Sequence, residues 1–512
     1  MLAKVNSMAV VGLESFPVEV EVDISRGLPS FNIVGLPDKA VEESKERVRS
    51  AIKNSGAKFP MQRITVNLAP ADLKKQGPAY DLAIAIGILI ADKQIPKLDD
   101  LVDSVFIGEL ALDGSIRHIF GILPIVIESK KRKLNKIYIP HVNAPEASLV
   151  DDINIIACNT LGDLIFYFKD EKKINPYVRK YDFINNVESS EYDFAYVKGQ
   201  EQAKRALEIA SAGAHNILMS GSPGSGKTLL AKSFKTILPP LNQSEVLEVT
   251  KIYSVSGLLP HDTPLVNYRP LRSPHHTASH IALVGGGAWP KPGEITLSHR
   301  GVLFLDEFPE FPRSVLEALR QPLEDGTITV SRAQGTITYP ANFILVAAQN
   351  PCPCGYWGDK DRECMCTSSQ IVRYQKKISG PLLDRIDVHL DVPRVKFEKL
   401  SQDNLAESSL EVRKRIVRAR QIQKKRFLYT KNHVNKITNS EMNQRDIKKH
   451  CSIDDKSKTI LKNAVEQLNL SARAYFRVLK IARTISDLEN SENIKIDHIA
   501  EALQYRPKEK VY

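Results

Sequence analysis

Eight consecutive residues, Gly221 to Thr228, have the types and spacing of a phosphate-binding loop. Their sequence, GSPGSGKT, fits the pattern G-x-x-x-x-G-K-[ST] and lies between a short apolar run and a helix-like segment. Its glycines let backbone N–H groups turn toward phosphate oxygens, while Lys227 brings a positive charge and Thr228 a hydroxyl for Mg²⁺. The full spacing with both flanks favours a site for ATP and Mg²⁺ over a chance glycine turn. The predicted loop consists of Gly221, Ser222, Pro223, Gly224, Ser225, Gly226, Lys227 and Thr228.

Two carboxylates follow a second apolar run, VLFLDE, at residues 302–307. The apolar residues predict a buried strand, so Asp306 and Glu307 emerge at its carboxyl end, where open α/β sheets bind their ligands. We expect Asp306 to hold Mg²⁺ and Glu307 to orient or deprotonate the attacking water. By itself, an apolar strand followed by Asp-Glu is a weak indication of a catalytic site. Downstream of a phosphate loop it is a strong one.

Four of the six cysteines lie within fifteen residues: Cys352, Cys354, Cys364 and Cys366. Four thiolates suit tetrahedral Zn²⁺, and a cluster in a chain with so few cysteines favours a metal over disulfides. However, C-x-C pairs are less diagnostic than C-x-x-C pairs, because one intervening residue strains simultaneous ligation. A structural zinc site, a redox pair and unliganded surface cysteines therefore all remain open.

A histidine-rich segment, SPHHTASH at residues 273–280, is a weaker metal candidate. It has no cysteine or acidic residue close by in the sequence, so we expect a loop that packs against the nucleotide-binding domain.

The elements that must position these residues divide the 512-residue chain into three parts. Runs that alternate apolar and polar residues, such as residues 18–24, come first together with helices and predict strands. Short apolar runs of the type buried in a parallel sheet, at residues 216–220, 302–306 and 342–348, then alternate with helix-like segments. The chain is helical toward its end. We therefore predict an α/β protein with an N-terminal domain at residues 1–170, a linker at 171–195, a core at 196–395 and a helical domain at 396–512.

Composition places the chain among soluble globular proteins, with 42% hydrophobic and 26% charged residues. The ten-residue apolar run Leu82 to Ala91 is about half the ~20 residues that span a bilayer, so we predict a buried core helix there. The N-terminal residues lack the apolar stretch and cleavage site of a signal peptide. We therefore expect a cytoplasmic protein with no membrane partner.

The phosphate loop and five further motifs together resemble the magnesium-chelatase-like AAA+ ATPases of the ComM/YifB group. These motifs are RPLRSPHHT (269–277), VLFLDEFPEF (302–311), NP (350–351), SGPLLDRIDVH (379–389) and LSARAYFRVLKIARTISDL (470–488). The resemblance covers essentially the whole chain. It implies a Lon-protease-like α+β domain at the N-terminus, an AAA+ P-loop α/β domain with a parallel sheet, and a C-terminal helical lid domain.

The resemblance also implies roles for three polar residues. Asn350 would be the first sensor, which positions the attacking water, and Arg385 would be an arginine finger that reaches a neighbouring subunit's nucleotide. Arg473 would be the second sensor, which contacts the γ-phosphate from the lid. Each places a donor or a cation where charge develops on the transferring phosphoryl group.

The N-terminal domain lacks the catalytic pair of the Lon proteases that it resembles. Ala79 stands where the nucleophilic serine would be, and Leu123 stands where the lysine would be. A serine–lysine dyad needs both groups, so we expect no peptidase activity and a structural or partner-binding role. Lys74 and Lys75 have no nucleophile beside them, and we expect both on the solvated surface.

Two segments are candidates for contact with DNA. Residues 326–339 predict a β-hairpin with Arg332 near its tip, a position that points into the pore of a ring in proteins of this type. Residues 411–427 carry eight Lys and Arg, and residues 401–512 hold +10 of the net charge of +11. That basic helix either binds nucleic acid or is simply a solvated surface, and no base-reading motif is visible.

The residues themselves predict hydrolysis of Mg-ATP. The resemblance further implies a ring of subunits, a hexamer in this family, that translocates on or remodels branched or double-stranded DNA without sequence specificity. A chelatase subunit that drives metal insertion into a tetrapyrrole is the second possibility. A binding scaffold gated by ATP is the third.

Overall fold

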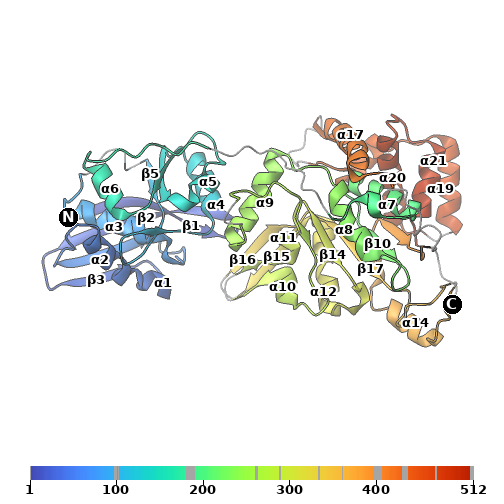
Figure 1. Cartoon of the computed structure of the whole chain (residues 1–512), viewed down its shortest axis with the longest axis horizontal. Coiled ribbons are helices and arrows are strands. Elements are labelled where there is room, and N and C mark those ends of the chain that lie inside the picture. The colour runs from blue at the N-terminus through green and yellow to red at the C-terminus, as the bar shows by residue number, and fades with distance from the viewer. Residues whose placement is uncertain are drawn as a thin grey trace. The chain divides into compact units, whose positions relative to one another are not determined.

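The computed structural model describes residues 2–96, 101, 103–179, 191–259, 263–287, 290–332, 335–359, 361–395, 406–428, 436–467 and 470–507. The chain forms two compact units (Figure 1). The first consists of residues 1–184 with 243–266, and the second of residues 185–242 with 267–512. Within the described part of the chain, no helix combines the length and the apolar character needed to cross a membrane.

The first unit is built on a seven-stranded mixed sheet with the strand order β3-β4-β2-β1-β5-β8-β9. Its long antiparallel pair β1–β2 turns at Gly12, and the alternating run at residues 18–24 lies inside β2, as the pattern predicts. The sheet strands are β1 (Leu2–Val11), β2 (Glu14–Ser25), β3 (Ser30–Val34), β4 (Arg63–Ala69), β5 (Ser104–Phe106), β8 (Lys136–Pro140) and β9 (Asn154–Cys158), and β6 (Glu109–Leu110) pairs with β7 (Ile116–Arg117).

Helix α3 (Asp81–Ala91) forms the centre of this unit, and every one of its residues is buried. It packs against β1, β2 and α2, which confirms the prediction of a buried core helix for the ten-residue apolar run. The other helices are α1 (Lys39–Glu42), α2 (Ser44–Asn54), α4 (Ile122–Lys131), α5 (Ala144–Ala147), α6 (Leu161–Phe168) and α9 (Gln243–Ser256).

One expectation for this unit is wrong. Lys75 is buried rather than solvated, and its ammonium group donates a hydrogen bond to the backbone oxygen of Pro70. A backbone bridge between Pro37 and Lys75 holds the segment in place, and the Pro70 carbonyl oxygen gives the buried ammonium group a hydrogen-bond acceptor. Lys74 is exposed, as expected.

The second unit contains a five-stranded parallel sheet with the order β11-β14-β17-β10-β18. The runs that predict buried strands at residues 216–220, 302–306 and 342–348 form β10, β14 and β17. The strands are β10 (Ile217–Ser220), β11 (Leu271–Arg272), β14 (Val302–Leu305), β17 (Ile344–Gln349) and β18 (Val388–Asp391).

Helices and two hairpins surround this sheet, with α8 packed against β17 and α7 against β18 (Figure 1). Hairpin β12 (Gly285–Gly286) with β13 (Lys291–Pro292) lies beside hairpin β15 (Thr327–Arg332) with β16 (Gly335–Pro340). The helices are α7 (Glu201–Gly213), α8 (Lys227–Ile237), α10 (His280–Val284), α11 (Glu294–Leu297), α12 (Arg313–Ala318), α13 (Arg320–Asp325), α14 (Ser368–Gln375) and α15 (Gly380–Leu383).

The C-terminal helices share one hydrophobic core with this sheet. Helix α20 packs against α7, and α17 packs against both α7 and α8. The C-terminal helices are α17 (Ser409–Leu428), α18 (Gln444–His450), α19 (Asp455–Gln467), α20 (Ala472–Leu488) and α21 (Ile496–Gln504).

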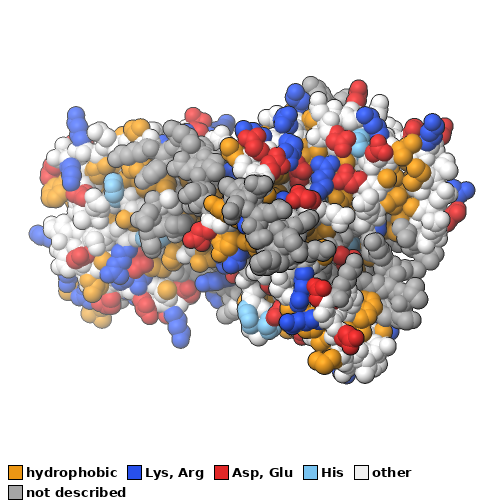
Figure 2. Space-filling model, turned by 45° about the vertical axis from the view of Figure 1, so that its right-hand side comes forward, with side chains coloured by type: hydrophobic (Ala, Val, Ile, Leu, Met, Phe, Trp, Pro, Cys, Tyr) orange, Lys and Arg blue, Asp and Glu red, His pale blue; other side chains and the backbone are white. Residues whose placement is uncertain are grey.

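Several arginines of α17 make contacts inside the unit. Arg415 donates to Glu208 at 2.6 Å, Arg420 to the Ser211 carbonyl at 2.8 Å, and Arg426 to Asp487. On the face shown in Figure 2, Lys and Arg side chains are interspersed with Asp and Glu. For these arginines the contacts favour a structural role over a nucleic-acid surface.

Asp387 links the sheet to the C-terminal helices through a buried charge. Its carboxylate accepts from Arg477 of α20 and from the backbone N–H of Asn216 at 3.1 Å, and it lies 3.5 Å from His215. Burial by itself opposes ionisation, but Arg477 and His215 outweigh it and hold the pKa of Asp387 below its ordinary value. Removing one partner of such a pair leaves an uncompensated buried charge, so α20 is tied firmly to the start of β18.

Candidate nucleotide-binding site

The phosphate-binding loop connects β10 to α8 and stands at the carboxyl edge of the parallel sheet. Gly224 and Gly226 have φ values of 76° and 90°, which favour glycine and turn the backbone ahead of α8. Gly221 lies so close to β18 that a Cβ there would stand 2.3 Å from the Val392 carbonyl oxygen. The glycines are thus required by geometry, and the loop presents the N-terminus of α8 as an anion site.

Lys227 is buried and lies folded across this loop. Its ammonium group donates to the carbonyl oxygens of Gly221 at 2.7 Å and Ser222 at 3.0 Å, and to Oδ1 of Asn350 at 3.3 Å. Burial lowers the pKa of Lys227, and the charge of Asp306 opposes that shift. The structure therefore brings together the loop lysine and Asn350, which are separated by 123 residues in sequence.

Thr228 and Asp306 form the second contact of the site. The Thr228 hydroxyl donates to Oδ2 of Asp306 at 2.9 Å, which joins the first turn of α8 to the end of β14. A hydroxyl beside a carboxylate is a donor set that suits Mg²⁺, so the residues present fit the ion that the motif implies. The backbone N–H of Glu307 also donates to Asp306, at 2.9 Å.

Glu307 has a partner that the sequence analysis missed. Its backbone is left-handed, with φ of 51°, and its carboxylate lies 2.9 Å from Nδ1 of His276. The rings of His275 and His276 lie 4.1 Å apart. In the sequence, only the two adjacent histidines could have suggested this contact, because His276 is 31 residues from Glu307 and no acidic residue adjoins it. The histidine-rich segment thus contributes a side chain directly to the candidate catalytic carboxylate.

A hollow of about 480 Å³ adjoins the phosphate loop. Apolar side chains from Val197 and Leu229 line it together with Tyr196, Gln200 and Arg394, next to residues of the loop itself. Its position beside the loop and its apolar lining suit a nucleobase.

The two arginines implied by resemblance lie together at a single carboxylate. Glu324 of α13 pairs with Arg385 and, through Oε1, with Arg473 at 3.2 Å. Arg385 is buried, and its backbone carbonyl accepts from Arg477 at 2.7 Å. Neither arginine is among the described residues that line the hollow at the phosphate loop. The structure thus groups these two arginines with each other and with Glu324. No sequence pattern predicted that Glu324 would pair with them.

Arg332 is exposed at the end of β15, and the hairpin forms where the sequence predicts it. Its guanidinium group lies against the hairpin formed by β12 and β13, next to Gly286. Hydroxyl groups face each other across the two strands, with Thr329 and Thr338 at 3.2 Å and Ser331 and Thr336 at 3.0 Å. Residues 333 and 334, at the predicted tip, lie outside the described part of the chain.

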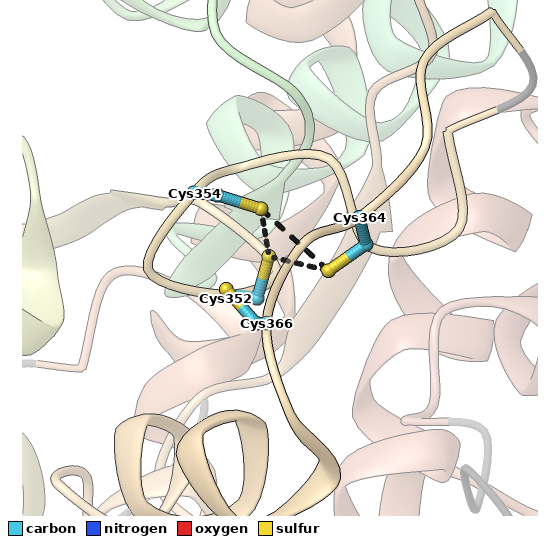
Figure 3. A group of neighbouring side chains, drawn as sticks. All are labelled: Cys352, Cys354, Cys364 and Cys366. Atoms are coloured by element: carbon cyan, nitrogen blue, oxygen red, sulfur yellow. Dashed lines mark hydrogen bonds between the residues drawn. The ribbon is translucent and has the colours of Figure 1, made fainter.

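The four clustered cysteines converge in space, with ligand atoms within 4.8 Å of one another (Figure 3). The Sγ atom of Cys352 lies 3.4 Å from that of Cys354 and 3.6 Å from that of Cys364, and Cys366 lies beside them. Desolvation opposes ionisation of Cys354, but hydrogen bonds from the Tyr356 backbone and the Cys352 thiol lower its pKa to about 6. Four sulfurs of this proximity, one of them readily ionised, fit the donor set of a tetrahedral thiophilic metal.

Comparisons with known proteins agree with this arrangement. The family model described as magnesium chelatase, subunit ChlI, matches residues 193–400. A second model, described as subunit ChlI of Mg-chelatase, matches residues 20–143, and a third, described as magnesium chelatase, subunit ChlI C-terminal, matches residues 406–506. The chain is 44% identical to competence protein ComM of Haemophilus influenzae over 99% of this chain and 97% of that protein. It is 42% identical to the uncharacterized protein YifB of Salmonella typhimurium, again over 99% and 97%.

A partial similarity extends to Lon protease 2 of Bacillus subtilis, with 29% identity over 34% of this chain and 33% of that protein. The mixed α/β architecture with a parallel sheet and a helical C-terminal part is consistent with these relatives. The near-complete coverage by ComM and YifB is decisive for the assignment. The chain belongs to the ComM/YifB group of the magnesium-chelatase-like AAA+ family of ATPases.

Proposed function

We propose that this protein hydrolyses Mg-ATP at the interfaces of a ring of identical subunits and uses the energy to translocate on or remodel branched or double-stranded DNA. The observation that supports hydrolysis is the convergence of Lys227, Asn350, Thr228 and Asp306 at one edge of the parallel sheet. The DNA assignment rests on the relative named competence protein ComM, since competence concerns the uptake of DNA.

Each residue of the site has a distinct task in this mechanism. ATP supplies the phosphoanhydride bond, and Mg²⁺ offsets charge on its oxygens when both are bound. The loop backbone and Lys227 would hold the β- and γ-phosphates, while Thr228 and Asp306 would hold the ion. Glu307 accepts a proton from the attacking water, and the 2.9 Å contact with His276 orients its carboxylate. Asn350 positions that water.

The two grouped arginines serve the neighbouring subunit in this proposal. Arg385 and Arg473 share Glu324 and lie apart from the hollow at their own phosphate loop, which suits side chains that act on a nucleotide held elsewhere. In a ring, each interface would combine one subunit's loop with the next subunit's arginines. A hexamer is the ring size that we propose from the family.

Contact with DNA is assigned to the β15–β16 hairpin rather than to α17. The hairpin offers an exposed arginine and a row of hydroxyl groups, both of which bind phosphates without reading sequence. In contrast, several arginines of α17 are used inside the subunit. A role as a metal-chelatase subunit is the second candidate, favoured by the family description alone.

We also propose that the four cysteines hold one structural Zn²⁺. The support is the meeting of four sulfurs from two C-x-C pairs, separated by nine residues, within 4.8 Å. Four thiolates complete a tetrahedral shell and leave no open position for catalysis.

Replacing Lys227 with alanine should abolish productive nucleotide binding, because the phosphates lose their main cation. Glu307→Gln should bind ATP and hydrolyse it slowly, since the hold of Thr228 and Asp306 on Mg²⁺ survives while proton transfer is lost. Binding of a fluorescent ATP analogue and steady-state hydrolysis measure the two effects. Equal loss of binding in both variants would contradict this division of roles.

Arg385→Ala subunits should bind ATP and hydrolyse very little, with a loss on the order of 10³-fold, because the transition state lacks its trans cation. Mixing them with Lys227→Ala subunits should restore hydrolysis, since some interfaces then pair an intact loop with an intact arginine. The exposed Arg373→Ala serves as the matched control and should keep full activity. Mixed rings with confirmed subunit exchange that stay as inactive as both parents would refute the shared site.

Branched and double-stranded DNA should stimulate ATP hydrolysis, and the stimulation should weaken as salt rises, because phosphate contacts release counterions. Arg332→Ala should lower the ratio of stimulated to unstimulated rates, whereas Arg418→Ala, an exposed position on α17, should leave that ratio unchanged. Loss of stimulation in Arg418→Ala alone would move the DNA path to the basic helix. An ATPase indifferent to DNA and stimulated by chelatase subunits would favour the second candidate.

The purified protein should contain about one Zn²⁺ per chain, and Cys352→Ser should contain much less, because three thiolates hold the ion weakly. Elemental analysis of protein prepared without chelators measures both. Met365→Ala, an 88% exposed position between two of the ligands, is the matched control. Wild-type protein without metal would exclude the zinc site.

A further inference from the structure

The loop that carries the four cysteines packs directly against the phosphate-binding loop. Gly355, between the first pair and the second, has φ of 87°, and a Cβ there would stand 2.5 Å from Cδ of Pro223. Pro223 is the third residue of the GSPGSGKT loop. The two loops therefore touch with no room for a side chain between them.

A buried carboxylate strengthens this contact. Asp359 accepts a hydrogen bond from the hydroxyl of Ser222, and its side chain is only 4% exposed. Arg394 lies 3.4 Å from the Asp359 carboxylate, and it donates to the Pro223 carbonyl oxygen at 3.4 Å. The Arg394 guanidinium also lies over the ring of Tyr356, 5.5 Å from its centroid. Asp359 and Arg394 thus contact two neighbouring residues of the phosphate loop, Ser222 and Pro223.

The same cysteine loop begins at the polar end of β17. Asn350, whose side chain accepts from Lys227, is separated from Cys352 by a single proline. The Pro351 carbonyl oxygen accepts from Gln375 of α14 at 3.1 Å, which fixes this turn. A shift of Cys352 would therefore be transmitted to Asn350 as well as to the phosphate loop.

The shape of this loop depends on the cysteine cluster. Its described residues, 352–359 and 361–366, contain neither helix nor strand, so few backbone hydrogen bonds hold them. The Sγ atom of Cys352 lies 3.4 Å from that of Cys354 and 3.6 Å from that of Cys364, and four thiolates at such distances would repel one another unless a cation lay between them. Binding of a metal to such a loop contributes directly to its folding. A metal bound by the four cysteines would therefore also fix the position of Asp359.

We propose that the metal held by these four cysteines controls the affinity of the nucleotide site, by fixing Asp359 and Gly355 against Ser222 and Pro223 of the phosphate loop. This inference rests on the proposed zinc and ATP sites and adds a regulatory link between them. With the metal bound, the phosphate loop is held in its binding conformation. Without the metal, the loop loses this support, and nucleotide binding weakens.

The test measures Mg-ADP affinity and zinc content of the full-length protein side by side. Removing zinc with a chelator should weaken binding of a fluorescent ADP about tenfold, on the scale of one lost charge-assisted hydrogen bond, and adding zinc back should restore it. Asp359→Ala should keep its zinc and show a similar loss of affinity. Combining Asp359→Ala with Cys364→Ser should cause no further loss, because both changes remove the same support.

Two exposed neighbours provide the controls, with Asp361→Ala for the carboxylate and Met365→Ala for the cysteine pair. Both variants should bind zinc and ADP as the wild type does. Equal ADP affinity of the zinc-loaded and zinc-free proteins would overturn the inference, as would an unchanged affinity in Asp359→Ala with zinc bound. Absence of zinc from the wild type would instead contradict the metal site, while the effect of Asp359→Ala would still report on the contact itself.

Discussion

The parallel pairing of β10 with β17 and of β17 with β14 is the constraint on which the nucleotide site depends. Parallel strands end at the same edge, so the three segments that follow them are brought together although they are far apart in sequence. The phosphate loop follows β10, Asp306 follows β14 and Asn350 follows β17. Their contacts, Lys227 with Asn350 and Thr228 with Asp306, are therefore consequences of strand order.

A second constraint is electrostatic and lies one strand away, before β18. Asp387 is buried, and its charge is stabilised by Arg477 of α20 and by His215, which follows α7. Arg477 also donates to the Arg385 carbonyl oxygen, and Arg473, one helical turn earlier, pairs with Glu324. The position of α20 and the position of Arg385 are thus set by the same buried carboxylate. A movement of the C-terminal helices would displace both arginines together.

The sequence predicted the local features well, because each depends on residues close together in the chain. The spacing of Gly221 to Thr228 specifies a tight turn, and the run Leu82 to Ala91 is apolar on every side, so both were recognisable without a structure. The pairings of His276 with Glu307 and of Asp359 with Ser222 had no such signal, because they join loops through tertiary contacts. The burial of Lys75 likewise had no local signal, because its contacts are a backbone bridge to Pro37 and a hydrogen bond to the Pro70 carbonyl oxygen.

Charge balance explains why one subunit is an incomplete catalyst in the proposed mechanism. Around the phosphate loop, Lys227 is accompanied by the carboxylates of Asp306 and Glu307. In the proposed mechanism these carboxylates would hold the ion and accept a proton rather than offset phosphate charge. Phosphoryl transfer spreads negative charge over the γ-phosphate oxygens, and further cations must stand close to them in the transition state. Arg385 and Arg473 are available, but both are paired with the single carboxylate of Glu324 at a place away from the hollow. The phosphates of a nucleotide bound to an adjacent subunit would compete with Glu324 for both arginines. The same exchange of ionic partners would then accompany both subunit assembly and ATP hydrolysis.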